Sequence, residues 1–261
     1  MQHLINLETI EQNIDTTEPI LLSHIDTHKI YWLGIDEDTA FRCNVYMIED
    51  NDEYIIIDPG SREYHQQVKQ RVEKIVPAQK ISALILCHQD PDVAASVIDW
   101  LDINPDLTII TSARVNVLLP HYGKSEYNFY DIATNNIWEF KSGHKLEFIE
   151  APFLHFSGAF TVYDITSSFL FSGDIWAALD TQWSLIVKDF DYHITLMDLF
   201  HIDYMASNKA TRGFAQKLEG RKIEAILPQH GSIIDKNNIQ NAIDYLIDLQ
   251  CGLDLIYPEL D

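Results

Sequence analysis

The chain has 261 residues, 46% of them hydrophobic and 22% charged, which is ordinary for a globular protein with a sizeable core. A formal net charge of −22 repels phosphate backbones and anionic headgroups, and so argues against nucleic acid and membrane surfaces as partners. The three cysteines are widely separated, no apolar run reaches the roughly 20 residues of a membrane span, and the N-terminal residues lack the pattern of a signal peptide, so we expect a cytoplasmic protein.

Strand-like segments begin at residue 28, after an N-terminal extension over residues 1–27. Short β-rich runs separated by acidic or glycine-containing turns cover residues 28–35, 41–50 and 53–60. Apolar residues at helical spacing predict a helix over residues 61–76. The apolar run at 82–87 does not alternate, which suits a strand covered on both faces, and residues 92–103 are predicted to form the next helix.

The second half of the chain continues this pattern of strands and helices. Strands are predicted over residues 108–113, 145–152, 160–168, 169–174 and 223–231, and helices over residues 193–220 and, at the close, 238–252. No repeat or linker divides the sequence, so we expect residues 1–261 to form one domain. Two β-rich halves with helices between them predict an α/β fold, a four-layer αββα sandwich.

Potential metal ligands directly follow several of the apolar runs. His88, Asp90 and Asp92 follow the run at 82–87, and alternate residues leaving a strand point the same way, so they can meet at one centre. Three more stand at the ends of later strands: His155, Asp174 and His230. Side chains at the carboxyl ends of strands converge on a crevice in α/β proteins. These six residues therefore predict a metal site, whereas the remaining histidines, His28 and His144 among them, follow no such pattern.

Three imidazoles and three carboxylates make a mixed nitrogen and oxygen ligand set. Such a set suits iron, manganese or zinc, and it is too rich in oxygen for a closed structural zinc site. For residues 88–92 alone, a polar loop with a helix-capping aspartate is the alternative. Cys87 adjoins a candidate ligand, but on an alternating strand its side chain points to the opposite face, into the core.

The sequence resembles the metallo-β-lactamase-like diiron domain of the flavodiiron proteins. That family carries HxExDH, a later histidine in an LHWPD-type segment, a bridging aspartate in an SxDxF-type segment and a terminal HG. The matching text here is HQDPDV, FLHFSG, FSGDIW and QHG, and the resemblance extends over residues 28–250. It implies a metallo-β-lactamase-like sandwich that holds two metal ions.

The resemblance assigns each ligand to a metal. One metal is held by His88, Asp90 and His155, the other by Asp92 and His230, and Asp174 bridges the pair. A zinc hydrolase of the same superfamily typically offers a histidine at the position of Asp90, and a carboxylate there is a hard anionic donor that stabilises higher oxidation states. Two iron ions are therefore expected, with manganese or zinc as the alternatives.

Two positions depart from the family's pattern. Asp90 replaces the usual glutamate with a shorter arm, and Val93 stands where the family places a further histidine. The second metal would then keep three protein ligands and an open position for oxygen or another small ligand. Alternatively, another side chain such as His121 fills the gap.

The resemblance implies three functions for such a centre. Flavodiiron enzymes reduce oxygen or nitric oxide with electrons from FMN in an attached flavodoxin-like domain, and we expect no flavin in this chain. We therefore favour a stand-alone non-haem diiron protein that binds molecular oxygen and acts as an oxygen, redox or iron sensor through a signalling partner. A homodimer is favoured. The alternatives are an oxygen or nitric oxide reductase fed by a separate electron-donor flavoprotein, and a metallo-hydrolase of a small ester or phosphodiester.

The segment at 121–138 is rich in aromatic residues and allows two interpretations. It can form a lid that brings the hydroxyl group of Tyr122, Tyr127 or Tyr130 to a bound oxygen species. The simpler interpretation is that these rings pack as ordinary core residues.

Overall fold

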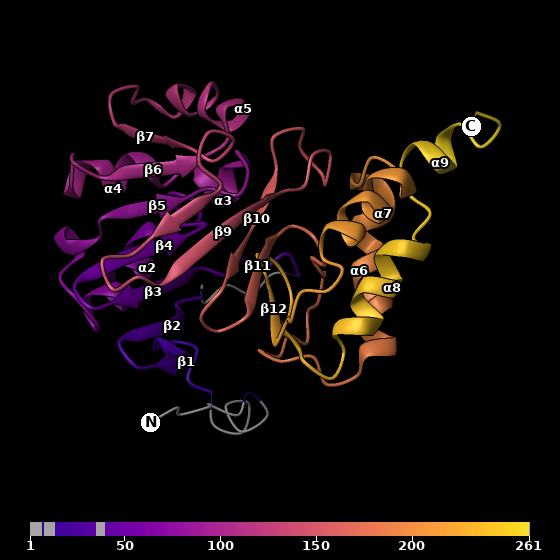
Figure 1. Cartoon of the computed structure of the whole chain (residues 1–261), viewed down its shortest axis with the longest axis horizontal. Helices are drawn as coiled ribbons and strands as arrows, with labels where there is room; N and C mark the ends of the chain where they lie inside the picture. Colours follow the sequence, from indigo (N-terminus) through magenta and orange to yellow (C-terminus); the bar gives the residue numbers. More distant parts are fainter. Residues whose placement is uncertain (1–6, 8–13, 35–39, 261) are drawn as a thin grey trace.

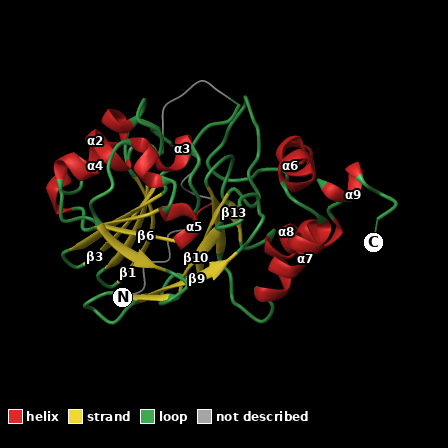
Figure 2. Cartoon of the chain, turned by 90° about the horizontal axis from the view of Figure 1, so that it is seen from above, coloured by secondary structure: helices red, strands yellow, loops and turns green. Residues whose placement is uncertain are grey.

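The structure, a computed structural model, describes residue 7 and residues 14–34 and 40–260. Two β-sheets pack face to face, and helices cover the outer surface of each, so the layers run helix, sheet, sheet, helix (Figures 1 and 2). The prediction of an α/β sandwich is confirmed. In Figure 1 the first sheet and its helices lie on the left, and the orange and yellow helices that cover the second sheet lie on the right.

The first sheet has seven strands within the described residues, in the order β1-β2-β3-β4-β5-β6-β7. They are β1 (Ile20–Ile25), β2 (His28–Trp32), β3 (Tyr46–Asp50), β4 (Glu53–Ile57), β5 (Ala83–Ile85), β6 (Thr108–Thr111) and β7 (Asn128–Asp131). Strands β1 to β4 are antiparallel, whereas β4 to β7 are parallel and joined by longer crossovers. Residues 20–25, which we expected to belong to an N-terminal extension, instead form β1 and pair with β2.

The second sheet has the order β13-β12-β11-β10-β9-β8. Its strands are β8 (Ile137–Glu139), β9 (Lys145–Glu150), β10 (Phe160–Asp164), β11 (Phe169–Gly173), β12 (Ala225–Pro228) and β13 (Ile234–Asp235). Only β11 and β12 pair in parallel within this part of the structure, so the chain leaves both strands at the same edge of the sheet. That edge faces the ends of β4 and β5, and the candidate ligands lie there.

Short helices cover the first sheet and longer ones the second. The first group contains α2 (His65–Glu73), α3 (Pro91–Ala94), α4 (Val97–Ile103), α5 (Ala113–Asn116) and the 3₁₀ turns η2 (Ala78–Lys80) and η3 (Leu119–Tyr122). The second contains α6 (Phe190–Tyr204), α7 (Asn208–Lys217) and α8 (Ile239–Asp248), and the short α9 (Leu253–Ile256) lies beyond this layer, near the C-terminus (Figure 1). The helix predicted over 92–103 is broken between α3 and α4, and the predicted closing helix is α8. Among the described helices, none has the length and apolarity needed to cross a membrane.

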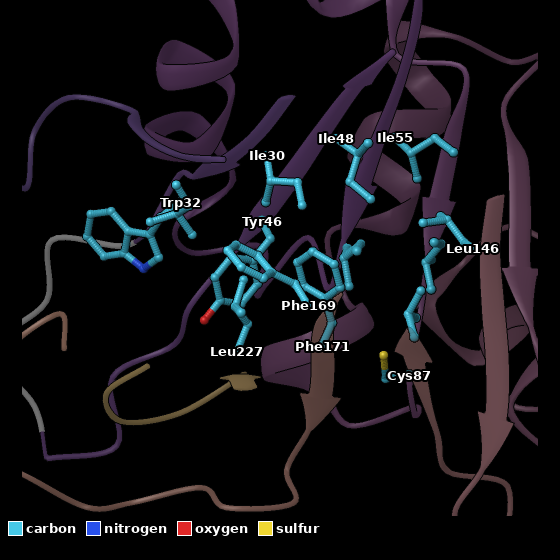
Figure 3. Packing of buried hydrophobic residues seen from close by; sticks show 14 of the residues in the cluster. Ile30, Trp32, Tyr46, Ile48, Ile55, Cys87, Leu146, Phe169, Phe171 and Leu227 are labelled. Atoms are coloured by element: carbon cyan, nitrogen blue, oxygen red, sulfur yellow. The ribbon is translucent and has the colours of Figure 1, made fainter. Parts of the chain in front are cut away.

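Apolar side chains fill three spaces between the four layers. Between the sheets, Ile30 and Ile55 of the first sheet belong to the same buried cluster as Phe171 of the second (Figure 3). Cys87 is fully buried in this cluster, as its position on an alternating strand predicts. Trp32, also fully buried, closes one end of it. This packing fixes the two sheets against each other and so fixes the distance between ligands contributed by each.

Candidate metal centre

The loop at 88–92 starts three residues after β5 and leads directly into α3. Asp90 precedes the helix in an extended conformation, and Pro91 occupies the first helical position, where its fixed φ suits the start of a helix. Asp92 then lies in the first turn, where the free N–H groups favour a negative charge. The backbone therefore turns sharply after His88 and keeps all three side chains at the end of the sheet.

One half of the site gathers His88, Asp90 and His155 around Asp174. His155 Nε2 lies 3.3 Å from Asp90 Oδ2 and 3.0 Å from Asp174 Oδ2. His88 Nε2 lies 3.2 Å from the same Asp174 oxygen and 3.8 Å from Asp90 Oδ2. The two imidazole rings stand nearly perpendicular, with their centroids 5.2 Å apart. Four ligand atoms thus surround one point, from the loop after β5, the turn after β9 and the end of β11.

The other half lies on the opposite side of Asp174. His230 Nε2 is 3.1 Å from Asp92 Oδ2 and 3.7 Å from Asp174 Oδ1, so the two oxygens of Asp174 face different halves. Cys43 Sγ is 4.0 Å from Asp92 Oδ2, and Cys43, Asp92 and His230 offer ligand atoms within 4.8 Å of one another. The structure therefore brings the six predicted residues together and adds a thiol that the sequence did not predict.

Several of these ligand atoms are buried without a hydrogen-bond partner in the described structure: they are His88 Nε2, Asp174 Oδ1 and His230 Nε2. Each such atom costs about 1–3 kcal/mol if it stays unpaired. Three of them aimed at one small space indicate that the space is built for a ligand. Imidazole nitrogens and carboxylate oxygens are donors for iron, manganese and zinc, so the residues present fit a pair of these cations.

The tautomer of His230 is fixed by its surroundings. Its Nδ1–H group donates to the carbonyl oxygen of Arg42 at 3.2 Å, which leaves the Nε2 lone pair facing Asp92 and Asp174. The ring of Phe41 stacks on the imidazole with centroids 3.6 Å apart. Gly231 follows with φ of +87°, and a Cβ there would lie 2.8 Å from Ala178 Cβ, which explains the glycine of the QHG motif.

Asn44 clamps the loop that carries His230. Its Nδ2 donates to the carbonyl oxygens of Pro228 and Gly231, both at 2.9 Å, and its Oδ1 accepts from Trp32 Nε1 at 2.8 Å. The side chain is 1% exposed, so water cannot replace these bonds. Nothing in the local sequence predicted this role, because the two carbonyl groups that Asn44 binds are more than 180 residues away along the chain.

We expect Asn44→Ala to weaken metal binding at the His230 half and to lower the free energy of unfolding by about 1–3 kcal/mol, because it leaves buried polar groups unpaired. Urea unfolding and metal counting on the purified chain measure the two effects. The control is Asn104→Ala, which removes a partly buried bond to Ile81 far from the site and should leave metal content unchanged. Equal metal content in the Asn44→Ala variant and the wild type would contradict the clamp.

Asp58 positions the other side of the site. Its carboxylate accepts from the Cys87 N–H group at 2.8 Å, one residue before His88. Burial raises the pKa of Asp58 to about 6, although the bond to Cys87 and the nearby His88 act in the opposite direction. The sequence showed only a DPG turn here, so this aspartate was missed as a site residue.

Charges within the site perturb the histidines strongly. Burial alone lowers the pKa of His88, but Asp174 and Asp90 outweigh it and raise the pKa to about 9. For His155, burial again lowers the pKa and the same two carboxylates raise it to about 10. Burial also disfavours the charged form of Asp174, yet the surrounding histidines hold its pKa well below the usual value. In the metal-free protein the site is therefore a network of imidazolium and carboxylate groups.

We expect metal binding at pH 7 to release about two protons per chain, because the Nε2 atoms of His88 and His155 must be deprotonated to ligate. Apparent affinity should rise with pH until it passes about 9 to 10. The free energy of unfolding of the metal-free protein should change in the opposite direction. The raised pKa values of His88 and His155 contribute fully to this stability below about pH 6.5, and the contribution is lost as pH rises through 9 to 10. Calorimetry in buffers of different ionisation enthalpy counts the protons, and a release near zero would contradict this picture.

The tyrosines of the segment 121–138 lie in different places. Tyr127 donates to Asn116 Oδ1 and Tyr130 to the carbonyl oxygen of Ile137, so their hydroxyl groups are engaged away from the ligands. Tyr122 donates to the carbonyl oxygen of Gln89, within the ligand loop, and burial together with Asp90 and Asp92 raises its pKa to about 12. Only Tyr122 of these three is hydrogen-bonded to that loop in the described structure.

The structure also shows what surrounds Val93, which stands where the family places a further histidine ligand. Val93 is fully buried in the apolar cluster between the first sheet and its helices. The side chain gathered with Asp92 and His230 is Cys43, and His121 belongs to none of the clusters of potential metal ligands among the described residues.

Solved structures of known proteins are similar to this chain. The apo state of the chemotaxis sensor ODP from T. denticola superposes with a TM-score of 0.83 and is 30% identical, covering 93% of this chain and 99% of that one. A peroxy diiron species of chemotaxis sensor ODP gives a TM-score of 0.82 at 30% identity, covering 92% of this chain and 100% of that one.

Curated relatives are more distant and much longer. Diflavin flavoprotein A 1 of Synechocystis sp. is 24% identical over 167 residues, which is 61% of this chain and 29% of that protein. The chain spans well under half the length of the curated relatives that it matches. The family described as ODP family beta lactamase matches residues 41–231, close to three quarters of the chain. This chain therefore belongs to the ODP family of β-lactamase-like proteins.

Proposed function

We propose that this protein is a non-haem diiron protein that binds molecular oxygen and acts as an oxygen, redox or iron sensor through a partner protein. The observation that carries the proposal is the division of ligand atoms about Asp174, whose two oxygens face two separate groups of donors. The likeness to chemotaxis sensor ODP over the full length of that chain supports the same conclusion.

In this proposal one iron would be held by His88, Asp90 and His155, the other by Asp92 and His230, with Asp174 shared between them. When bound, a ferrous pair would supply two electrons for chemistry with oxygen. The protein's own part is to keep six donors in place before any metal arrives, by the backbone of α3 and by the Asn44 and Asp58 bonds. Cys43 is placed where it can occupy or border the remaining position on the second ion.

The ligands of the site differ in their exposure to solvent. His88, Asp174 and His230 are at most 4% exposed, whereas the side chains of Asp90 and Asp92 are about one third exposed. Solvent therefore reaches the centre past the two carboxylates. On the other side, the stacked rings of Phe200 and Tyr204 both contact His155 edge-on and leave its side chain 15% exposed.

Anaerobic loading with ferrous iron followed by air tests the proposal. We expect two irons per chain, a visible absorption band that persists after oxygen is added, and slow oxygen consumption even with NADH and a flavoprotein donor. Rapid consumption under these conditions would instead identify an oxygen reductase. Preferential retention of zinc with turnover of small esters or phosphodiesters would identify a hydrolase and overturn the proposal.

A further inference from the structure

A second cluster of ligand-type side chains lies at the far end of the sandwich. His28 begins β2, Asp50 ends β3, His144 directly precedes β9 and Asp164 ends β10. The candidate diiron site lies at the opposite ends of these strands, as shown by the Phe160 N–H group at the start of β10, which donates to the carbonyl oxygen of Cys87. The cluster is therefore separate from that site and draws residues from both sheets.

Three ligand atoms of this cluster converge. His28 Nδ1 lies 3.0 Å from Asp50 Oδ2, and His144 Nδ1 lies 2.7 Å from the same oxygen. The rings of His28 and His144 are nearly perpendicular with centroids 5.1 Å apart, close to the 5.2 Å and similar angle between His88 and His155. All three ligand atoms lie within 4.8 Å of one another.

The fourth residue, Asp164, is placed as an orienting group. His28 Nε2 lies 3.1 Å from Asp164 Oδ2, on the side of the ring away from Asp50. The carboxylate is itself held by the N–H groups of Thr166 and Ser167 and by the Ser167 hydroxyl. A carboxylate that accepts the second N–H of a ligating imidazole is the usual support of a protein metal site, because it fixes the tautomer and raises the basicity of the ligand.

The charge of the cluster suits a divalent cation. His28, Asp50 and Asp164 are fully buried, and two carboxylates in such a place need positive charge beside them. Both carboxylates lie against the His28 ring, with Asp50 Oδ2 3.0 Å from Nδ1 and Asp164 Oδ2 3.1 Å from Nε2, so positive charge between them is favoured. One divalent ion balances both carboxylates when it displaces the protons from the two Nδ1 atoms.

We propose that His28, Asp50 and His144 bind one divalent cation of the zinc class, with Asp164 as the orienting carboxylate. Two histidines and one carboxylate with an open fourth position are a known zinc ligand set. The route to the site is the His144 side chain, which is 26% exposed, whereas Asp50 and His28 are fully buried. The cation joins the two sheets at the end remote from the candidate diiron site.

Zinc counting on the full-length chain tests this site. We expect about three zinc ions per wild-type chain, two at the candidate diiron site and one here, and about two in His144→Ala. The control is His24→Ala on neighbouring β1, whose ring contacts only the carbonyl oxygen of Asp26 among the described side-chain bonds, and it should keep the wild-type count. Equal zinc content in His144→Ala and the wild type would mean that protons alone occupy the cluster, and would overturn the proposal.

Asp164→Asn separates a positioning role from a structural one. The amide keeps the shape of the side chain but is a weaker acceptor, so we expect about 10–100-fold weaker zinc binding at this site. The two remaining zinc ions serve as the internal check that each variant is folded. Asp174→Asn gives the reciprocal check. This variant should still bind the zinc ion at His28, Asp50 and His144, so the proposals for the two sites are tested independently.

Discussion

Replacement of Asp174 by asparagine is expected to empty both halves of the candidate diiron site. The residue is 4% exposed, and its two oxygens approach His88 and His155 on one side and His230 on the other. Asparagine keeps the shape but removes the negative charge that two adjacent cations require, and its NH₂ group offers no lone pair to either cation. We expect metal affinity to fall by at least ~100-fold, since even supporting residues contribute 10–100-fold.

Iron content after anaerobic loading and desalting measures the effect of Asp174→Asn. Wild type should retain two irons per chain and the variant almost none. Asp203→Asn on α6 is the matched control, because Asp203 is exposed and the same charge is removed. If Asp174→Asn kept both irons, the aspartate would not bridge the ions, and the assignment of ligands to two metals would be wrong.

The largest effect on stability is expected for Trp176→Ala. The ring is fully buried among the helices of the second sheet, its Nε1–H group donates to the carbonyl oxygen of Ala242 in α8, and it meets Phe214 of α7 edge-on. The Trp176 N–H group donates to Nε2 of His201 in α6. One residue thus joins the end of β11 to three helices.

Removal of such a side chain leaves a cavity and an unpaired carbonyl group, so we expect a loss of about 3–5 kcal/mol in the free energy of unfolding. Because Trp176 lies two residues after Asp174, metal retention should also fall. Urea unfolding of the metal-free protein gives the first quantity. Tyr192→Ala, at a residue 57% exposed on α6, should change stability by no more than about 0.5 kcal/mol, and a comparable loss in both variants would contradict the argument.

The strands and the six candidate ligands were accessible from the sequence because their signals are local. Alternating or continuous apolar runs predicted β2 to β6 and β9 to β12. Candidate ligands such as His88 and Asp174 were recognised because they are polar residues at the ends of these runs. By contrast, β7 and β8 are short and largely exposed, so their pattern is weak. The break between α3 and α4 was missed because it depends on bonds from Ser96 to Pro59 and Gly60, on a separate loop.

Long-range contacts account for most of the remaining misses. Cys43 and Asn44 join the site through contacts to residues near 230. No feature of the sequence around these two residues predicts those contacts. His28 and Asp164 are 136 positions apart, so neither carries a recognisable pattern alone. Such side chains come close enough to bind a common ligand only when the two sheets pack together. A single sequence does not show which positions on the two sheets will face each other.

The placement of ligands on both sheets has a consequence for how the protein matures in the cell. His230 is the last of the six to be synthesised, so neither a nascent chain nor a folding fragment can hold both cations. Before metal binds, the imidazolium groups of His88 and His155 offset part of the carboxylate charge, so we expect the chain to fold without metal. When iron is scarce, the cell should therefore accumulate finished, vacant molecules that remain competent for loading, and the vacant fraction would follow the supply of the metal.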